Sequence, residues 1–102
     1  MQNGRLTRGR IPVEKVTEGD YKIRLPATSV ESGAYTFELK NDGQDAHNLA
    51  IEGPGLPAKE TPTIGPGKTA SLEVELQPGT YELFCSVPGH RELGMSAKLD
   101  VT

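Results

Sequence analysis

The chain has 102 residues, of which 34% are hydrophobic and 25% are charged, as is typical of one globular domain with one core. A single cysteine excludes an internal disulfide, a four-cysteine zinc site, an iron–sulfur cluster and a C-x-x-C redox motif. The formal net charge of −3 divides into +3 over residues 1–15 and −6 over the remainder, and with only five Phe and Tyr residues nothing indicates nucleic-acid binding.

No window approaches the roughly 18 consecutive apolar residues that span a bilayer. Residues 1–10 contain three arginines but no apolar segment, so we expect neither a signal peptide nor a membrane anchor in the chain as it stands, and no stable membrane insertion. The expected organisation is a flexible N-terminal tail over residues 1–10 and one domain over residues 11–102.

Twelve glycines and eight prolines divide the chain into pieces too short for ordinary helices. Apolar residues alternate within these pieces, which predicts half-buried β-strands. The alternating sets, in chain order, are Ile11 and Val13; Tyr21, Ile23 and Leu25; Tyr35, Phe37 and Leu39; Leu49 and Ile51; Ala70, Leu72, Val74 and Leu76; Tyr81, Leu83 and Cys85; and Met95, Ala97, Leu99 and Val101.

Turn sequences over residues 41–43, 65–67 and 77–79 separate these predicted strands. Short strands at this spacing predict an all-β domain, a β-sandwich of about seven to eight strands with Greek-key connections. Residues 53–68, with four prolines and four glycines, show no strand pattern. We expect a loop there, either functional or a simple crossover between sheets, in which a helical turn could form over residues 57–61.

Residues with metal-binding chemistry concentrate between 81 and 95. Cys85 ends a predicted strand on its inward face, a Pro-Gly turn brings in His90, and Met95 opens the next strand. The only other histidine, His47, begins the strand after the 41–43 turn, so an antiparallel sandwich could place it at the same end. Two imidazoles, a thiolate and a weak axial thioether are the ligand set of a blue-copper electron-transfer site.

Two other chemistries use part of the same set. His47, Cys85 and His90 could bind zinc with a water as the fourth ligand, but Met95 occupies the place that a hydrolase would leave open for that water. A cysteine hydrolase is disfavoured because an inward-facing strand residue lacks the exposed, electropositive surroundings that activate a thiolate.

The segment from Cys85 to Met95 resembles the C-x4-H-x4-M copper loop of the cupredoxins, on the azurin and auracyanin side of that family. His47-Asn48 resembles the upstream ligand pair of the family, and the similarity extends over residues 16–102. In plastocyanins the cysteine and the second histidine lie closer together, and Val87 stands where they have a proline.

The resemblance implies that His47, Cys85, His90 and Met95 bind one type 1 copper ion. It also implies that Asn48 donates its backbone N–H to the Cys85 sulfur and ties its side chain to Ser86. Because Val87 is not a proline, it keeps an N–H that could supply a second hydrogen bond to the sulfur.

These observations predict a small, monomeric blue copper protein that carries single electrons between larger redox proteins and is not an enzyme. The alternatives are a protein that sequesters or delivers copper, and an electron-relay domain cut from a larger copper oxidase or reductase. We expect an extracytoplasmic location, in the periplasm or at the cell surface.

Partners are expected to dock at an apolar patch around His90, formed by Ala46, Leu56, Pro57, Pro88 and Leu93. Phe84 is either a second electron route or a lone aromatic on a solvent face.

Overall fold

The computed structural model describes residues 11–102, and the tail predicted over residues 1–10 lies outside this part of the chain. The strands are β1 (Val13–Gly19), β2 (Lys22–Arg24), β3 (Ser29–Val30), β4 (Gly33–Asn41), β5 (Ala50–Gly53), β6 (Leu56–Glu60), β7 (Thr69–Leu76), β8 (Gly79–Phe84) and β9 (Ser96–Val101). A short 3-10 helix, η2 (Arg91–Leu93), precedes β9. Within the described residues, no helix has the length and hydropathy that crossing a bilayer requires.

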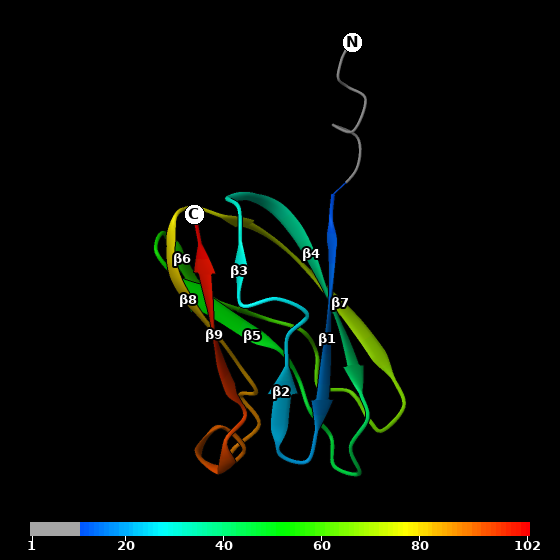
Figure 1. The fold of residues 1–102 in the computed structure, drawn as a ribbon. Coiled ribbons are helices and arrows are strands. Elements are labelled where there is room, and N and C mark those ends of the chain that lie inside the picture. The colour runs from blue at the N-terminus through cyan, green and yellow to red at the C-terminus, as the bar shows by residue number, and fades with distance from the viewer. Residues whose placement is uncertain (1–10) are drawn as a thin grey trace.

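The strands form two sheets that face each other (Figure 1). One sheet has the order β2-β1-β4-β7, and the other has the order β3-β9-β8-β5-β6. The chain changes sheet repeatedly, for example from β4 to β5 and from β6 to β7, as is typical of Greek-key sandwiches. Most neighbours are antiparallel, but β1 runs parallel to β4 and β3 runs parallel to β9. The predicted all-β sandwich is confirmed.

The core consists of the side chains that point inward from both sheets. Its residues are Val16, Tyr35, Phe37, Leu39, Leu49, Ile51, Leu72, Val74, Leu76, Tyr81, Leu83, Leu99 and Val101. The predicted alternation of burial is therefore correct for β4, β7 and β9. In β5 and β8 the predicted inward residues are buried, but Ala50 and Phe84, which are out of phase with them, are buried as well. Burial of this apolar surface is the main contribution to the stability of the sandwich.

Two strands in the described part of the chain have no counterpart in the prediction, which raises the strand number to nine. The two-residue β3 adds to the edge of its sheet beside β9. β6 lies where a helical turn was considered, and that expectation is wrong. Most of β6 is exposed, so it carries no alternation to read, and Pro57 is tolerated because an edge strand need not donate every backbone N–H.

The first predicted strand exists, but its buried residues are not the expected ones. Ile11 and Val13 are 43% and 51% exposed, whereas Val16 and Glu18 are completely buried. β1 pairs with β4 from Val13 to Glu18, and its inward face meets the core only in its second half. A carboxylic acid therefore enters the interior.

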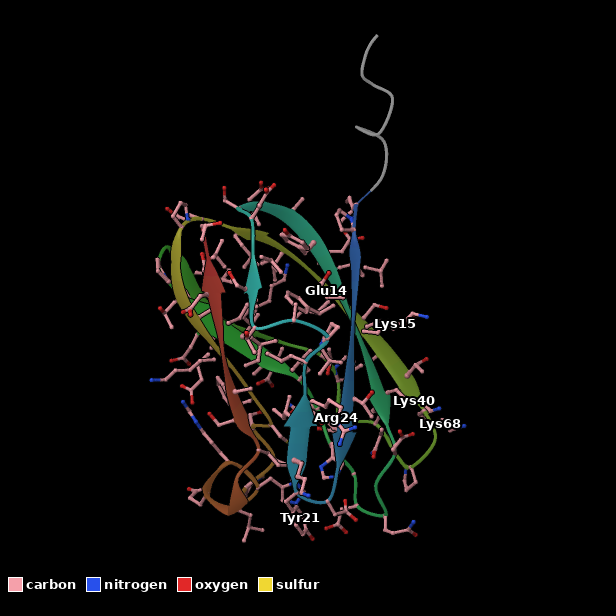
Figure 2. All side chains as sticks on the ribbon, viewed as in Figure 1. Glu14, Lys15, Tyr21, Arg24, Lys40 and Lys68 are labelled. Carbon is pink, nitrogen blue, oxygen red and sulfur yellow. The ribbon has the colours of Figure 1, made fainter. Side chains whose placement is uncertain are left out.

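Three connections meet at one end of the sandwich, opposite the C-terminus: the β1–β2 turn, the β4–β5 loop and the β8–β9 loop (Figure 1). Figure 2 shows Tyr21 at the tip of the β1–β2 turn at this end. A hydrogen bond from Asn41 Nδ2 to the Ile64 carbonyl oxygen, 3.0 Å long, brings in a fourth segment. We call this end of the sandwich the ligand end.

Candidate metal centre

The β8–β9 loop folds back on itself so that His90 returns to Cys85. The His90 N–H donates to the Val87 carbonyl over 3.0 Å, which closes the Pro-Gly turn. Gly89 lies at φ 85° and Gly94 at φ 117°, in the left-handed backbone region that residues other than glycine rarely adopt. The short helix η2 lies between these two glycines. The loop therefore delivers an imidazole five residues after the thiol.

His47 reaches the same point from the β4–β5 loop. Its backbone exchanges two hydrogen bonds with Ile64, of 3.0 and 2.8 Å, in an isolated bridge ahead of β5. Ile64 belongs to the segment that showed no pattern in the sequence, so part of that segment positions a candidate ligand. The His47 side chain is completely buried.

Three donor atoms converge at the ligand end. His47 Nδ1 and His90 Nδ1 are 3.2 Å apart, and Cys85 Sγ lies 3.9 Å from the former and 3.7 Å from the latter. The circle through these three atoms has a radius of about 2.1 Å, which matches the roughly 2.0–2.3 Å bonds of zinc-sized metal ions to imidazole nitrogen and thiolate sulfur. One ion can bond to all three atoms without moving them.

The fourth predicted ligand, Met95, lies directly before β9. Its carbonyl accepts a 3.1 Å hydrogen bond from the Cys85 N–H, and its own N–H donates to the His90 carbonyl over 3.3 Å. The side chain is completely buried. The backbone of Met95 is therefore fastened to two of the three converging residues.

The thiol of Cys85 is free and buried. Burial raises its pKa, while the backbone N–H groups of Asn48 and Val87 act in the opposite direction because they stabilise the thiolate. The Asn48 N–H points at the sulfur over 3.5 Å. A metal ion with affinity for soft ligands would displace the thiol proton and bind the thiolate.

Asn48 also ties the two ligand loops together. Its Nδ2 donates to Ser86 Oγ over 2.8 Å, and its Oδ1 accepts from the Ser86 N–H over 2.7 Å. Ser86 Oγ donates in turn to Glu60 of β6 over 2.9 Å. The structure thus brings together all the residues predicted around the sulfur, and adds Glu60.

Several residues of the centre were not predicted. Asp20, in the β1–β2 turn, places Oδ1 2.6 Å from His47 Nε2. The neighbouring Tyr21 ring meets the His90 ring edge to face, with centroids 5.0 Å apart, and its hydroxyl donates to Asp45. The hydrogen bond from the Gln44 N–H is the largest cause that holds the Asp20 pKa below its usual value, so this carboxyl is ionised at neutral pH. Contacts between distant loops leave no local pattern in a sequence.

Glu18 is a further residue that sequence reasoning missed. Neither oxygen has a hydrogen-bond partner among the described residues, and burial raises its pKa to about 8. When Glu18 is ionised, its charge raises the pKa of Cys85 further. The spacing from Val16 gave a usable signal, since every second strand residue faces the same way.

The surroundings of His90 differ from the predicted apolar patch. Its side chain is 13% exposed, and its Nε2 lies 3.9 Å from Asp45 Oδ2. Leu93 is 61% exposed, as expected near a surface patch. Leu56 and Pro57, however, lie at the other end of β6 from Glu60, so their placement beside His90 was wrong.

Phe84 is not a lone aromatic on a solvent face. It is only 6% exposed, because the Arg91 guanidinium lies 3.9 Å from the centre of its ring. Arg91 is held there by Glu82, which also accepts from Ser96 Oγ. The loop that supplies His90 therefore covers Phe84.

Comparison with known proteins gives the family. The family model described as a cupredoxin-like domain matches residues 8–95, and the chain belongs to this family. Among curated proteins, the iron uptake system component EfeO of Escherichia coli O1:K1 / APEC is 30% identical over 77 residues, which make up 76% of this chain and 20% of that protein. EfeO of Escherichia coli strain K12 is 29% identical over the same length. The chain spans about a fifth of these relatives.

Solved structures show the same fold. Auracyanin B superposes with a TM-score of 0.76 at 20% identity, covering 89% of this chain and 88% of that one. Auracyanin A from Chloroflexus aurantiacus, described as a "blue" copper protein, gives a TM-score of 0.69 at 23% identity over 88% and 98% of the two chains. A reduced amicyanin variant gives 0.63 at 23% identity over 86% and 80%.

Proposed function

We propose that the protein is a type 1 copper protein that carries single electrons between larger redox proteins. The observation that carries this proposal is the convergence of His47 Nδ1, His90 Nδ1 and Cys85 Sγ, at separations of 3.2 to 3.9 Å. A soft thiolate with two imidazoles selects copper, and Met95 is the expected weak axial ligand. Bound copper supplies a one-electron couple between Cu(II) and Cu(I).

Two features of the ligand residues support this function: they are held rigidly, and they fill the positions around the metal. His47 and Cys85 are completely buried and are held by neighbouring backbone groups, so the ligand positions change little when the charge of the site changes. Four protein ligands leave no position for a substrate, which supports a carrier rather than an enzyme.

His90 is the ligand nearest to a partner. It is the partly exposed member of the converging set, with 13% of its side chain exposed, whereas the His47 side chain is completely buried. A redox partner that docks over His90 would come within reach of the metal through one imidazole. The proposal includes docking over His90, a monomeric state and an extracytoplasmic environment. The copper function itself is supported by the description of auracyanin A as a "blue" copper protein.

A second function deserves a test because of the curated relatives. EfeO is named as an iron uptake component, and the region similar to this chain is a fifth of it. The same domain can therefore serve within a larger metal-handling protein, which favours sequestration or delivery as the alternative. A fast electron self-exchange rate supports the carrier. Slow exchange together with rapid release of copper to a chelator supports delivery.

The decisive experiment is titration of the metal-free protein with Cu(II). One equivalent should produce an intense visible band from sulfur-to-copper charge transfer, and Cys85→Ser should abolish the band while the far-UV circular dichroism stays that of a β-sandwich. Ser86→Ala is the matched control, because it changes the next residue without removing a ligand, and it should keep the band. A colourless wild-type adduct, or equal colour in Cys85→Ser, contradicts the proposal.

A further inference from the structure

The turn between β1 and β2 places a carboxylate behind the buried imidazole. Asp20 Oδ1 lies 2.6 Å from His47 Nε2, on the opposite side of the ring from the converging Nδ1 atom. The His47 side chain is completely buried, and that of Asp20 is 23% exposed. This contact joins the β1–β2 turn, which carries none of the predicted ligands, to the metal centre.

Other groups hold the Asp20 carboxylate in place. The Gln44 N–H donates to Oδ2 over 2.7 Å, and the Asp45 N–H donates to Oδ1 over 3.3 Å. Gly43 leaves the space that the contact needs, since a Cβ there would lie 2.2 Å from Asp20 Oδ1 and 2.9 Å from His47 Nε2. The φ angle of Gly43 is outside the left-handed region, so the lack of a side chain is what matters.

The position of the carboxylate determines the tautomer of His47. A neutral imidazole has one N–H, and an ionised carboxylate can only accept, so the proton lies on Nε2 and the lone pair lies on Nδ1. Nδ1 is the atom that faces Cys85 Sγ and His90 Nδ1. A carboxylate bonded to the far nitrogen also makes the ring a stronger electron donor to a bound ion.

We infer that Asp20 is a positioning residue: it presents His47 Nδ1 to the metal and makes the site prefer Cu(II) over Cu(I). The inference rests on the proposed copper function. The more highly charged Cu(II) gains more from a stronger donor, so loss of the Asp20 charge weakens Cu(II) binding more than Cu(I) binding.

The other half of the site provides a matched control. Asp45 carries the same charge at the ligand end, but its Oδ2 is 3.9 Å from His90 Nε2, too far for a hydrogen bond. Asp45→Asn therefore removes one charge near the centre and leaves the His47 contact in place. For Gly43→Ala the control is Gly65→Ala, because a Cβ at Gly65 has no atom within 4 Å.

The first experiment uses metal-free protein and needs no copper. The ¹⁵N chemical shifts of the His47 ring should show the Nε2–H tautomer in the wild type and in Asp20→Asn, whose amide oxygen still accepts. They should show a mixture of tautomers in Asp20→Ala and Gly43→Ala, while Gly65→Ala resembles the wild type. An unchanged tautomer in Asp20→Ala overturns the positioning role.

The second experiment measures the dissociation constants for Cu(II) and Cu(I). Asp20→Asn should weaken Cu(II) binding by about tenfold and change Cu(I) binding much less, while Asp45→Asn changes neither to that extent. Equal effects of Asp20→Asn and Asp45→Asn overturn the preference for Cu(II), because they reduce it to nearby charge. A wild type that forms no coloured copper adduct overturns the proposed function instead, and the tautomer measurement still decides whether Asp20 positions His47.

Discussion

The two imidazoles of the candidate metal centre are held in different ways. His47 is completely buried, hydrogen bonded through Nε2 to Asp20, and bridged through its backbone to Ile64. His90 lies in a loop between two left-handed glycines and is 13% exposed, and within residues 11–102 its Nε2 has no such close partner. The comparison teaches that one imidazole fixes the geometry of the site, while the other connects the site to the surface.

Deleting each imidazole in turn tests this difference most severely. In His90→Gly the vacated space opens to solvent, so added imidazole should enter, bind the metal and restore the visible band. In His47→Gly the space is enclosed, and added imidazole should fail to restore it. Visible spectra of the copper-loaded variants, with and without imidazole, give the answer. Equal rescue of both variants would show that the two halves are equally accessible.

A smaller effect, on the stability of the metal-free protein, is expected from the buried carboxyl group of Glu18. Its folded-state pKa is about 8, against 4.5 as the usual value, so the folded protein keeps a proton that the unfolded chain loses. The free energy of unfolding of metal-free protein should therefore fall as pH rises from about 4.5 to about 8, by at most roughly 5 kcal/mol.

The variant Glu18→Leu should lose this fall in stability and be more stable than the wild type at pH 8, as urea unfolding at several pH values will show. Glu14→Leu is the control, since Glu14 lies on the same strand but is only partly buried. A Glu18→Leu variant with the pH dependence of the wild type would show that the buried carboxyl does not control it.

The smallest of these effects concerns Met95, whose backbone is hydrogen bonded to Cys85 and His90. In the proposed site Met95 is a weak axial donor, which tunes the site without creating it. Met95→Leu should keep the visible band and raise the reduction potential by about 60 mV, equivalent to a tenfold change in the affinity ratio of the two oxidation states. Cyclic voltammetry measures this shift. Loss of copper binding in this variant would instead make Met95 a principal ligand.

The sequence predicted the His90 half of the site better than the His47 half. The residues from Cys85 to Met95 are contiguous, so their spacing and the Pro-Gly turn could be read directly. Asp20 could not be found in this way, because only folding brings the β1–β2 turn to His47. The exposed edge strand β6 was missed for a related reason: without a buried face it has no alternating pattern.

The prediction of burial was correct where one face of a sheet is apolar. It was wrong where side chains from loops cover a strand. Phe84 follows the alternation rule outward from Leu83, yet the Arg91 side chain folds over it and leaves 6% exposed. Glu18 shows the reverse case, since the alternation from Val16 places it inside although its charge suggests solvent.

Copper K-edge X-ray absorption of the protein loaded with one equivalent of Cu(II) tests the central claim most directly. A site formed by His47, His90, Cys85 and Met95 predicts one short copper–sulfur contact and two imidazole nitrogens in the first shell. In Cys85→Ser the short sulfur contact should be absent. A wild-type first shell made only of nitrogen and oxygen would contradict the assignment of these residues as the copper ligands.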